Sequence, residues 1–213
     1  DVAMVKTMTP SETTAITSRQ IAKFLDLQTA ALRKSGLSSA ETQQVLERQG
    51  GSIADEFVMS VRKRVEAVSK MIVRHVKINR AQKPQEALDA TGCKQYTDRE
   101  VVDAMPCGKV EEVDLYFFEP RPEAYQNGVL TDEALAKEYE FHRLEPHPRA
   151  LIQANKDDTT LAKTRPNGCH WKDASGKWCY VAFSCLGGVE RDVLVDRDVS
   201  GWIECWSFAG ARK

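Results

Sequence analysis

The first third of the chain has apolar residues at helical spacing. Thr17 with Gln20 makes a capping box that predicts a helix start, and Gly36 suits its end. The apolar face of this helix is formed by Ile21, Phe24, Leu25 and Leu32. Residues three, four and seven positions apart share one side of a helix, so this face needs a packing partner.

Two further helices are predicted before residue 75. Ser38 with Glu41 opens a short helix that we expect to end at Gly50-Gly51, and Ser52 caps the next one. The third helix carries a seam in which apolar residues step by three and four: Val58, Val61, Val65, Val68 and Ile72. Such a seam is typical of a helical hairpin or of a short oligomerising coil. We therefore expect it to pack against the first helix or against a second copy of the chain.

The pattern changes to short strands and helices after Arg74. Residues 75–78 alternate like a strand, and Pro84 opens a small helix over residues 85–89. The stretch 111–119 is the clearest strand in the chain, since its apolar residues alternate with acidic ones before a Phe pair.

Helices are predicted again in the next stretch. Thr131 is predicted to be a helix N-cap. The two acidic residues that follow it would lie in the first turn, where negative charge interacts favourably with the helix dipole. Pro146 and Pro148 end this helix and start another, from Arg149 to about Asn155.

From His170 the chain is rich in strand-forming residues. A turn over 173–176 joins two short strands, of which the second covers 178–183. Gly187-Gly188 reads as a further hairpin turn before a strand over 192–196. A strand, two helices and then antiparallel strands is an α+β order.

These patterns divide the chain into two parts. Residues 1–75 form a helical segment for packing or oligomerisation, and residues 76–213 form an α+β domain. Within that domain, we expect 178–183 and 192–196 to lie in one antiparallel sheet with Phe208 buried beneath it.

Two kinds of position interleave in the last thirty residues. One kind looks architectural: Val193, Val195, Trp202, Trp206, Phe208 and Gly210. The other kind looks chemically unconstrained: Ser184, Cys185, Leu186, Asp192, Leu194, Asp196, Asp198, Val199, Ser200, Ile203, Cys205 and Ser207. A rigid scaffold that presents unconstrained positions is typical of a binding surface.

The segment from His170 to Lys213, with HWKDASGKWCYVAF and a terminal WSFAGARK, resembles the variable proteins of diversity-generating retroelements. In that family a reverse transcriptase copies a template inaccurately at adenines and overwrites the 3′ end of the target gene. Template codons that begin with two adenines and end in a pyrimidine can reach all twelve unconstrained residues, but not Trp or Glu. The chain departs from the Gly-Phe-Arg ending of many family members, because it closes on residues 208–212 as FAGAR.

The resemblance covers residues 110–213 at most and implies a C-type lectin-like fold of the formylglycine-generating-enzyme type. It also implies a hypervariable, non-enzymatic protein that binds a variable protein partner without a cofactor. The binding surface would consist of the twelve unconstrained residues together with Trp202 and Trp206, which either frame it or belong to the core. Rigid aromatic side chains give contact area at a low entropy cost. Trp171 and Trp178 are expected in the core.

Composition is that of an ordinary globular protein. The chain of 213 residues is 42% hydrophobic and 29% charged, and it has no run of about 18 apolar residues that could span a membrane. Its start lacks the basic-then-apolar pattern of a signal peptide, so we expect a cytoplasmic protein, although Asp1 hints at a trimmed N-terminus.

Residues 1–80 hold 13 Lys and Arg against 8 Asp and Glu, whereas residues 81–213 hold 17 against 23. The two parts should attract each other or meet different partners.

No residue set points to catalysis or to a metal. The six cysteines form no C-x-x-C pair and the four histidines lack metal-ligand spacing, which favours reduced thiols. Cys169 and His170 are neighbours that would point to opposite faces of a strand, so they would not form a nucleophile pair. Asp192, Asp196 and Asp198 lack the pattern of a calcium loop. We therefore expect no enzyme activity, metal or cofactor.

The alternative function is that of a nucleic-acid-associated accessory protein that uses the basic segment 62–80. Its cations are Arg62, Lys63, Arg64, Lys70, Arg74, Lys77 and Arg80. Acidic residues are few there, but no aromatic side chain follows Phe57 to stack on bases. The solvated face of a helical hairpin would explain the same charges.

Overall fold

The computed structural model describes residues 16–69, 71–188, 190–197 and 201–212, apart from the side chains of residues 67–69 and 186. The chain divides into two compact units, Asp1–Val61 and Arg62–Lys213. The boundary drawn from the sequence, between residues 75 and 76, lies later. Part of the difference comes from β1 (Met71–Lys77), which pairs along its whole length with a strand of the second unit.

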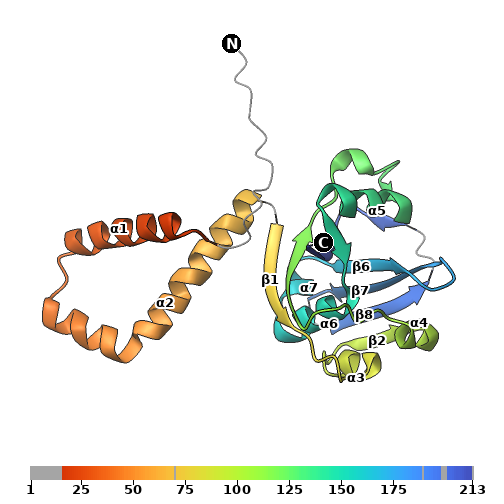
Figure 1. Ribbon diagram of the computed structural model, residues 1–213, viewed down its shortest axis with the longest axis horizontal. Coiled ribbons are helices and arrows are strands. Elements are labelled where there is room, and N and C mark those ends of the chain that lie inside the picture. Colours follow the sequence, from red (N-terminus) through yellow and green to blue (C-terminus); the bar gives the residue numbers. More distant parts are fainter. Residues whose placement is uncertain (1–15, 70, 189, 198–200, 213) are drawn as a thin grey trace, which may run out of the picture. The chain divides into compact units, whose positions relative to one another are not determined.

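The first unit holds α1 (Ser18–Lys34) and much of α2 (Ser39–Ser69), which extends into the second unit (Figure 1). The predicted capping box is confirmed: Thr17 Oγ1 accepts from the backbone N–H of Gln20, and the Gln20 side chain accepts from the N–H of Thr17. Gly36 adopts a φ of 70° just after α1, which confirms the predicted stop.

The predicted helix break at Gly50-Gly51 is wrong, because α2 continues through both glycines to Ser69. A glycine inside a helix costs only about 1 kcal/mol relative to alanine, and it keeps the N–H that a proline would remove. The helix predicted to begin at Ser52 is therefore the second half of α2. Ile72, predicted as the last seam residue, lies in β1 instead.

The predicted apolar seam of α2 stays largely open to solvent in a single chain. Val58 is 52% exposed and Val65 is 57% exposed, while the side chain of Val68 lies outside the described residues. The ring centroids of Phe24 on α1 and Phe57 on α2 lie 5.8 Å apart, and α1 has no buried residue. Val61 is half-buried, so Val58 and Val65 are the seam residues that stay uncovered, and packing of the seam against a second copy of the chain stays a prediction.

The second unit is built on an eight-stranded sheet of mixed direction. Its main path runs in the order β1, β3 (Glu112–Phe118), β10 (Ser207–Arg212), β6 (Asn167–Lys172), β7 (Trp178–Leu186), β8 (Glu190–Arg197) and β2 (Lys94–Thr97). A short strand, β5 (Leu144–Pro146), pairs with β10, and β4 (Val129–Leu130) pairs with β9 (Trp202–Ile203) in a separate ribbon. The pairs β10–β6 and β2–β8 are parallel, and the others are antiparallel.

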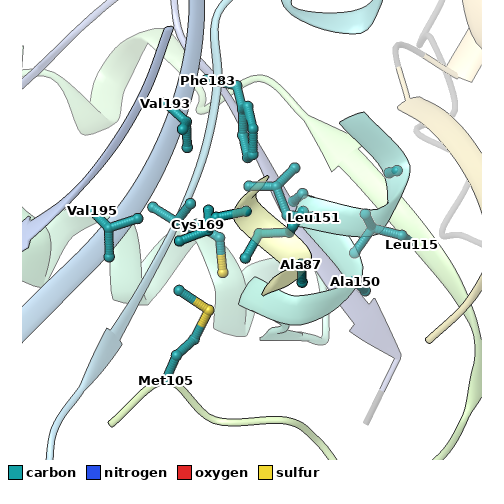
Figure 2. Packing of buried hydrophobic residues seen from close by; sticks show 14 of the residues in the cluster. Ala87, Met105, Leu115, Ala150, Leu151, Cys169, Phe183, Val193 and Val195 are labelled. Atoms are coloured by element: carbon teal, nitrogen blue, oxygen red, sulfur yellow. The ribbon is translucent and has the colours of Figure 1, made fainter. Parts of the chain in front are cut away.

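One face of the sheet is covered by four helices, α3 (Pro84–Asp89), α4 (Arg99–Asp103), α6 (Pro148–Asp157) and α7 (Leu161–Thr164). Leu151 of α6 packs there with Val193 and Val195 of β8 and with Phe183 of β7 (Figure 2). All four of these side chains are fully buried. Alternation along the strands explains this core, since every second residue of β7 and β8 faces the helices.

The other face carries α5 (Asp132–Phe141), the β4–β9 ribbon and a short 3-10 turn over Pro122–Ala124. Phe118, Leu135, Trp202 and Phe208 are buried there in a second apolar cluster. β3 is thus buried on both faces at its C-terminal end, which explains its continuous run of large apolar residues.

The main sequence predictions for this unit are confirmed. The α+β class holds, Thr131 caps α5 by accepting from the N–H of Ala134, and the strand predicted at 111–119 is β3. The stretches predicted over 178–183 and 192–196 pair antiparallel as β7 and β8, but the sheet as a whole is mixed. Phe208 is fully buried as predicted, although it lies in β10 of the same sheet and not beneath it.

Candidate functional site

A hollow of about 570 Å³ opens on the sheet face that carries Trp202. We call it the Trp202 hollow. Its described lining consists of Tyr96, Pro166, Tyr180, Ala182, Ser184, Asp192, Leu194, Gly201, Trp202, Ile203, Cys205 and Trp206. The floor comes from β2, β7 and β8, and described residues between Gly201 and Trp206 form a wall.

Strand register explains which residues reach this hollow. Ser184 lies opposite Asp192, and Ala182 lies opposite Leu194, across the antiparallel pair of β7 and β8. On the other side of β8, the parallel β2 places Tyr96 opposite Leu194. Paired residues share a face of a sheet, so these side chains gather on one side.

Trp202 lies over the smallest residues of the neighbouring strands. A Cβ atom added at Gly168, which pairs with Ala182, would come within 3.4 Å of the Trp202 indole. The indole is 2% exposed and meets three rings edge to face, with centroids 5.5 Å from Tyr180, 5.2 Å from Trp206 and 5.0 Å from Phe208. Edge-to-face pairs at these distances are favourable, so Trp202 fixes the orientation of the wall. It belongs to the core while also lining the hollow.

The first turn of α5 holds two tryptophans by their indole nitrogens. Trp202 Nε1 donates to Asp132 Oδ1 at 3.2 Å, and Trp178 Nε1 donates to Glu133 Oε1 at 3.0 Å. Asp132 Oδ1 also lies 3.0 Å from Nδ1 of His170, whose ring stacks on Trp178 at a centroid distance of 4.3 Å. Besides interacting favourably with the helix dipole, these two acids therefore connect α5 by hydrogen bonds to the wall of the hollow and to β6.

Burial sets the protonation of this network. Burial lowers the pKa of His170, and the neighbouring carboxylate of Asp132 opposes that shift. A neutral imidazole that carries its proton on Nδ1 can donate to Asp132, which fits the observed distance. Nearer the hollow, burial raises the pKa of Tyr180, and the charges of Asp196 and Asp132 raise it further. The phenol of Tyr180 is therefore neutral at ordinary pH.

Seven of the fourteen residues predicted to form a binding surface line the Trp202 hollow. They are Ser184, Asp192, Leu194, Trp202, Ile203, Cys205 and Trp206. They come from β7, from β8 and from the residues around β9. Asp196 lies on the same face of β8, two residues after Leu194, and is exposed. Ile203 is 55% exposed and Cys205 is exposed, as expected for an outward surface.

Other predicted residues lie elsewhere. Cys185 points to the opposite face of β7 from Ser184, because neighbouring residues on a strand alternate. Ser184 and Ser207 are each only 8% exposed, so the expectation that they are exposed is wrong, although Ser184 still lies on the face of the hollow. Ser207 is at the start of β10, where its hydroxyl donates to the Pro166 carbonyl at 3.2 Å and lines a different hollow. The side chain of Leu186 and residues 198–200, which include Asp198, Val199 and Ser200, lie outside the described residues.

Sequence reasoning missed several residues of this site. Tyr180 and Ala182 could have been found by extending the alternation of β7 back from Ser184. Tyr96 reaches the hollow only because β2 pairs in parallel with a strand far along the chain, for which no local signal exists. Asp132 was recognised as a first-turn acid, but its bond to Trp202 spans 70 residues.

The tryptophans expected in the core differ from each other. Trp171 is buried with 6% exposure in the helix-covered cluster. Trp178 is only half-buried and lies between His170 and Lys172, whose Nζ is 4.6 Å from the Trp178 ring centroid.

The basic segment 62–80 is partly neutralised within the chain. Arg74 pairs with Glu66 at 2.6 Å and with Asp158 at 3.5 Å, and Lys77 pairs with Glu112 at 3.2 Å. Arg62, Lys63 and Arg64 are exposed on α2, and Lys70 lies outside the described residues. This distribution fits a solvated face better than a continuous nucleic-acid surface.

Cys169 and His170 face opposite sides of β6, since Cys169 lies in the helix-covered cluster and His170 bonds to α5. No group of three or more His, Cys, Asp or Glu side chains among the described residues could hold a metal ion. None of the described helices is both long and apolar enough to cross a membrane. The six cysteines are unpaired.

Comparisons with known proteins add no family to these observations. No family model, no curated protein and no solved structure matches the chain.

Proposed function

We propose that the chain is a ligand-binding protein whose C-terminal surface, centred on the Trp202 hollow, binds a variable protein partner. In this proposal, a retroelement diversifies the unconstrained residues of that surface. The observation that carries it is the gathering of predicted positions from separate segments, among them Asp192, Leu194, Ile203 and Cys205, on one hollow. The sequence pattern alone did not require these segments to meet.

The alternation of buried and outward residues along β8 supports the proposal. Val193 and Val195 are fully buried against the helices, whereas Leu194 is half-buried and Asp196 is exposed on the other face. Replacing an outward residue of a strand leaves the opposite face intact. Diversification of this strand would therefore leave the fold in place.

We extend the proposal to a C-type lectin-like fold for the second unit, as the sequence resemblance implies. The order of elements is compatible with it: β3, the helices α5 and α6, the antiparallel run β6–β7–β8, and a last strand, β10. β10 returns to pair with β3, so that the two ends of this stretch lie side by side. A scaffold closed in this way would hold the diversified loops against a rigid sheet.

A binding role without catalysis fits the chemistry of the hollow. Ser184 and Cys205 are the aliphatic hydroxyl and the thiol among its described lining residues, beside the phenols of Tyr96 and Tyr180, and no histidine or lysine belongs to that lining. Asp192 lies opposite Ser184, but its Oδ1 atom accepts no hydrogen bond from the described residues. A nucleophile needs a base within hydrogen-bonding reach to be activated. The proposal accordingly assigns the hollow to recognition of a partner.

Sequencing the surroundings of the gene tests the proposal. We expect a reverse-transcriptase gene and a near-copy of the 3′ end that differs only at adenines. The differences should fall on the codons of Asp192, Leu194 and Ile203 and spare those of Val193 and Val195. A complete gene neighbourhood without such a copy, or a copy that varies at Val193 and Val195, would overturn the retroelement part of the proposal.

A further inference from the structure

The Trp202 hollow combines exposed aromatic rings with one negative charge. Tyr96 is 50% exposed, and Tyr180 and Trp206 are half-buried, so part of each ring faces solvent. Of the described lining residues, Asp192 alone carries a formal charge. Aromatic faces are negative and attract cations, most strongly where water is partly excluded. The lining therefore favours a positively charged group over a neutral or acidic one.

Asp192 has an unmet hydrogen-bonding capacity. Its Oδ1 atom is buried and accepts no hydrogen bond from the described residues. A carboxylate oxygen removed from water without a donor is costly, and buried polar atoms in proteins are nearly always bonded. A positive charge held beside this carboxylate in the hollow would offset that cost.

Two nearby cations pair with acids other than Asp192, although the ammonium of Lys94 also lies over the ring of Tyr96, a lining residue. Lys94, the register partner of Asp192 on β2, places its Nζ 3.5 Å from Glu190 and 5.5 Å from the Tyr96 ring centroid. Arg165 pairs with Glu119 and donates to the backbone carbonyls of Glu204 and Cys205. Neither is among the lining residues of the hollow, so its negative charge is open to a partner.

We infer that the Trp202 hollow receives a lysine or arginine side chain of the protein partner, with Asp192 as its counter-ion and Tyr96, Tyr180 and Trp206 as its aromatic walls. This inference rests on the proposed binding function and specifies the chemistry of what is bound. The aliphatic stem of such a side chain would cover Leu194 and Ala182, while its charged end meets Asp192. Charge complementarity of this kind selects basic partners and rejects acidic ones.

The test is a selection of random phage-displayed peptides on the full chain, followed by affinity measurements on synthetic peptides. We expect the enriched peptides to share a Lys or Arg, and its replacement by norleucine to abolish most of the binding. Asp192→Asn, which keeps the shape of the side chain, should weaken these peptides by roughly 10- to 100-fold, the range of one hydrogen bond to a charged group. Trp206→Leu keeps apolar area but removes the ring and should weaken them by a few-fold.

Glu204→Gln is the matched control, because it removes the same charge from an exposed residue outside the hollow lining. It should change peptide affinity less than twofold, and thermal melting should show that each variant is folded. Peptides that lose affinity with Ile203→Ser but contain no Lys or Arg would overturn the inference and leave the binding function standing. If no selected peptide depends on Ile203, Trp206 or Asp192, the inference and the assignment of binding to the hollow both fall. Equal losses for Asp192→Asn and Glu204→Gln would also overturn the inference.

Discussion

The helical unit and the sheet unit both carry apolar residues at regular spacing, yet they bury them very differently. On α1 and α2, Leu25, Leu32 and Val58 are each more than half exposed. In the sheet unit, strand residues such as Val193 and Phe208 have no exposed surface. Periodicity specifies which side chains share a face of an element, and burial additionally needs a second surface to cover that face. The sheet has helices or a ribbon on each side, whereas within the described part of the chain no such layer covers the outer faces of α1 and α2.

The largest expected effect comes from removing a side chain at the centre of the sheet unit. Phe208→Ala should destabilise this unit by about 3–5 kcal/mol, because it deletes a fully buried ring in contact with Trp202 and Phe118. The matched change in the helical unit is Leu25→Ala, at a side chain that is 56% exposed, and it should cost under about 1 kcal/mol. Chemical unfolding monitored by tryptophan fluorescence measures the first change, since all four tryptophans lie in the sheet unit. Similar losses for both variants would contradict the comparison.

Acidification should weaken the sheet unit selectively. Burial lowers the pKa of His142, His147 and His170, all of which lie in this unit. The unfolded chain, with a histidine pKa near 6.5, then binds more protons than the folded chain as the pH falls below about 6.5. The free energy of unfolding is therefore highest above about pH 6.5, where the histidines are neutral in both states. It decreases as the pH drops from there toward the pKa values of the folded chain.

Urea unfolding at about pH 7.5 and about pH 5.5 measures this loss. His170→Gln should flatten the dependence, because it removes one of the three titrating rings. The helical circular dichroism signal should respond less, since the two longest helices, α1 and α2, lie wholly or largely in the unit without these histidines. A sheet unit that is equally stable at both pH values would contradict the lowered pKa values of the three histidines.

A smaller effect is expected on the outward side of the sheet unit. Ile203→Ser should change the free energy of unfolding by only about 0.5 kcal/mol, because the side chain is 55% exposed. Val195→Ser on the helix-covered face buries a hydroxyl and removes a packed methyl group, so it should cost about 2–4 kcal/mol. Thermal melting of the pair compares the two faces directly, and equal losses would show that the exposed surface also carries stability.

The smallest effect on a single chain should come from α2. Val65→Asp replaces a side chain that is 57% exposed and should shift monomer stability by no more than about 0.5 kcal/mol. If two chains associate through the seam, the same change would bury a charge in the interface and lower the association constant strongly. Sedimentation equilibrium of the two forms distinguishes these cases, and identical self-association would exclude Val65 from any interface.

Sequence reasoning succeeded mostly where the signal was local, with one exception on α2. Thr131 as a cap, the strand now seen as β3 and the β6–β7 hairpin all depend on neighbouring residues, and each was predicted. The break at Gly50-Gly51 was wrong because a moderate local preference was outweighed by the helix on both sides.

The candidate site shows the same limit. Leu194 and Asp196 could be assigned to one face of a strand from alternation alone. The arrival of Tyr96 beside Leu194 and of Asp132 beneath Trp202 depends on parallel pairing and on helix placement, which no sequence pattern encodes. Buried Ser184 and Ser207 show that a small polar residue can be enclosed when its neighbours are large.

The two-residue period of β8 has a consequence for how its surface can change. One residue inserted just before Val193 would turn Val193 and Val195 toward the Trp202 hollow and Leu194 and Asp196 toward the helices. A deletion there would do the same, so both would exchange the apolar and polar faces of the strand. Any process that varies this strand must therefore preserve its length, exchanging one residue for another without adding or removing any.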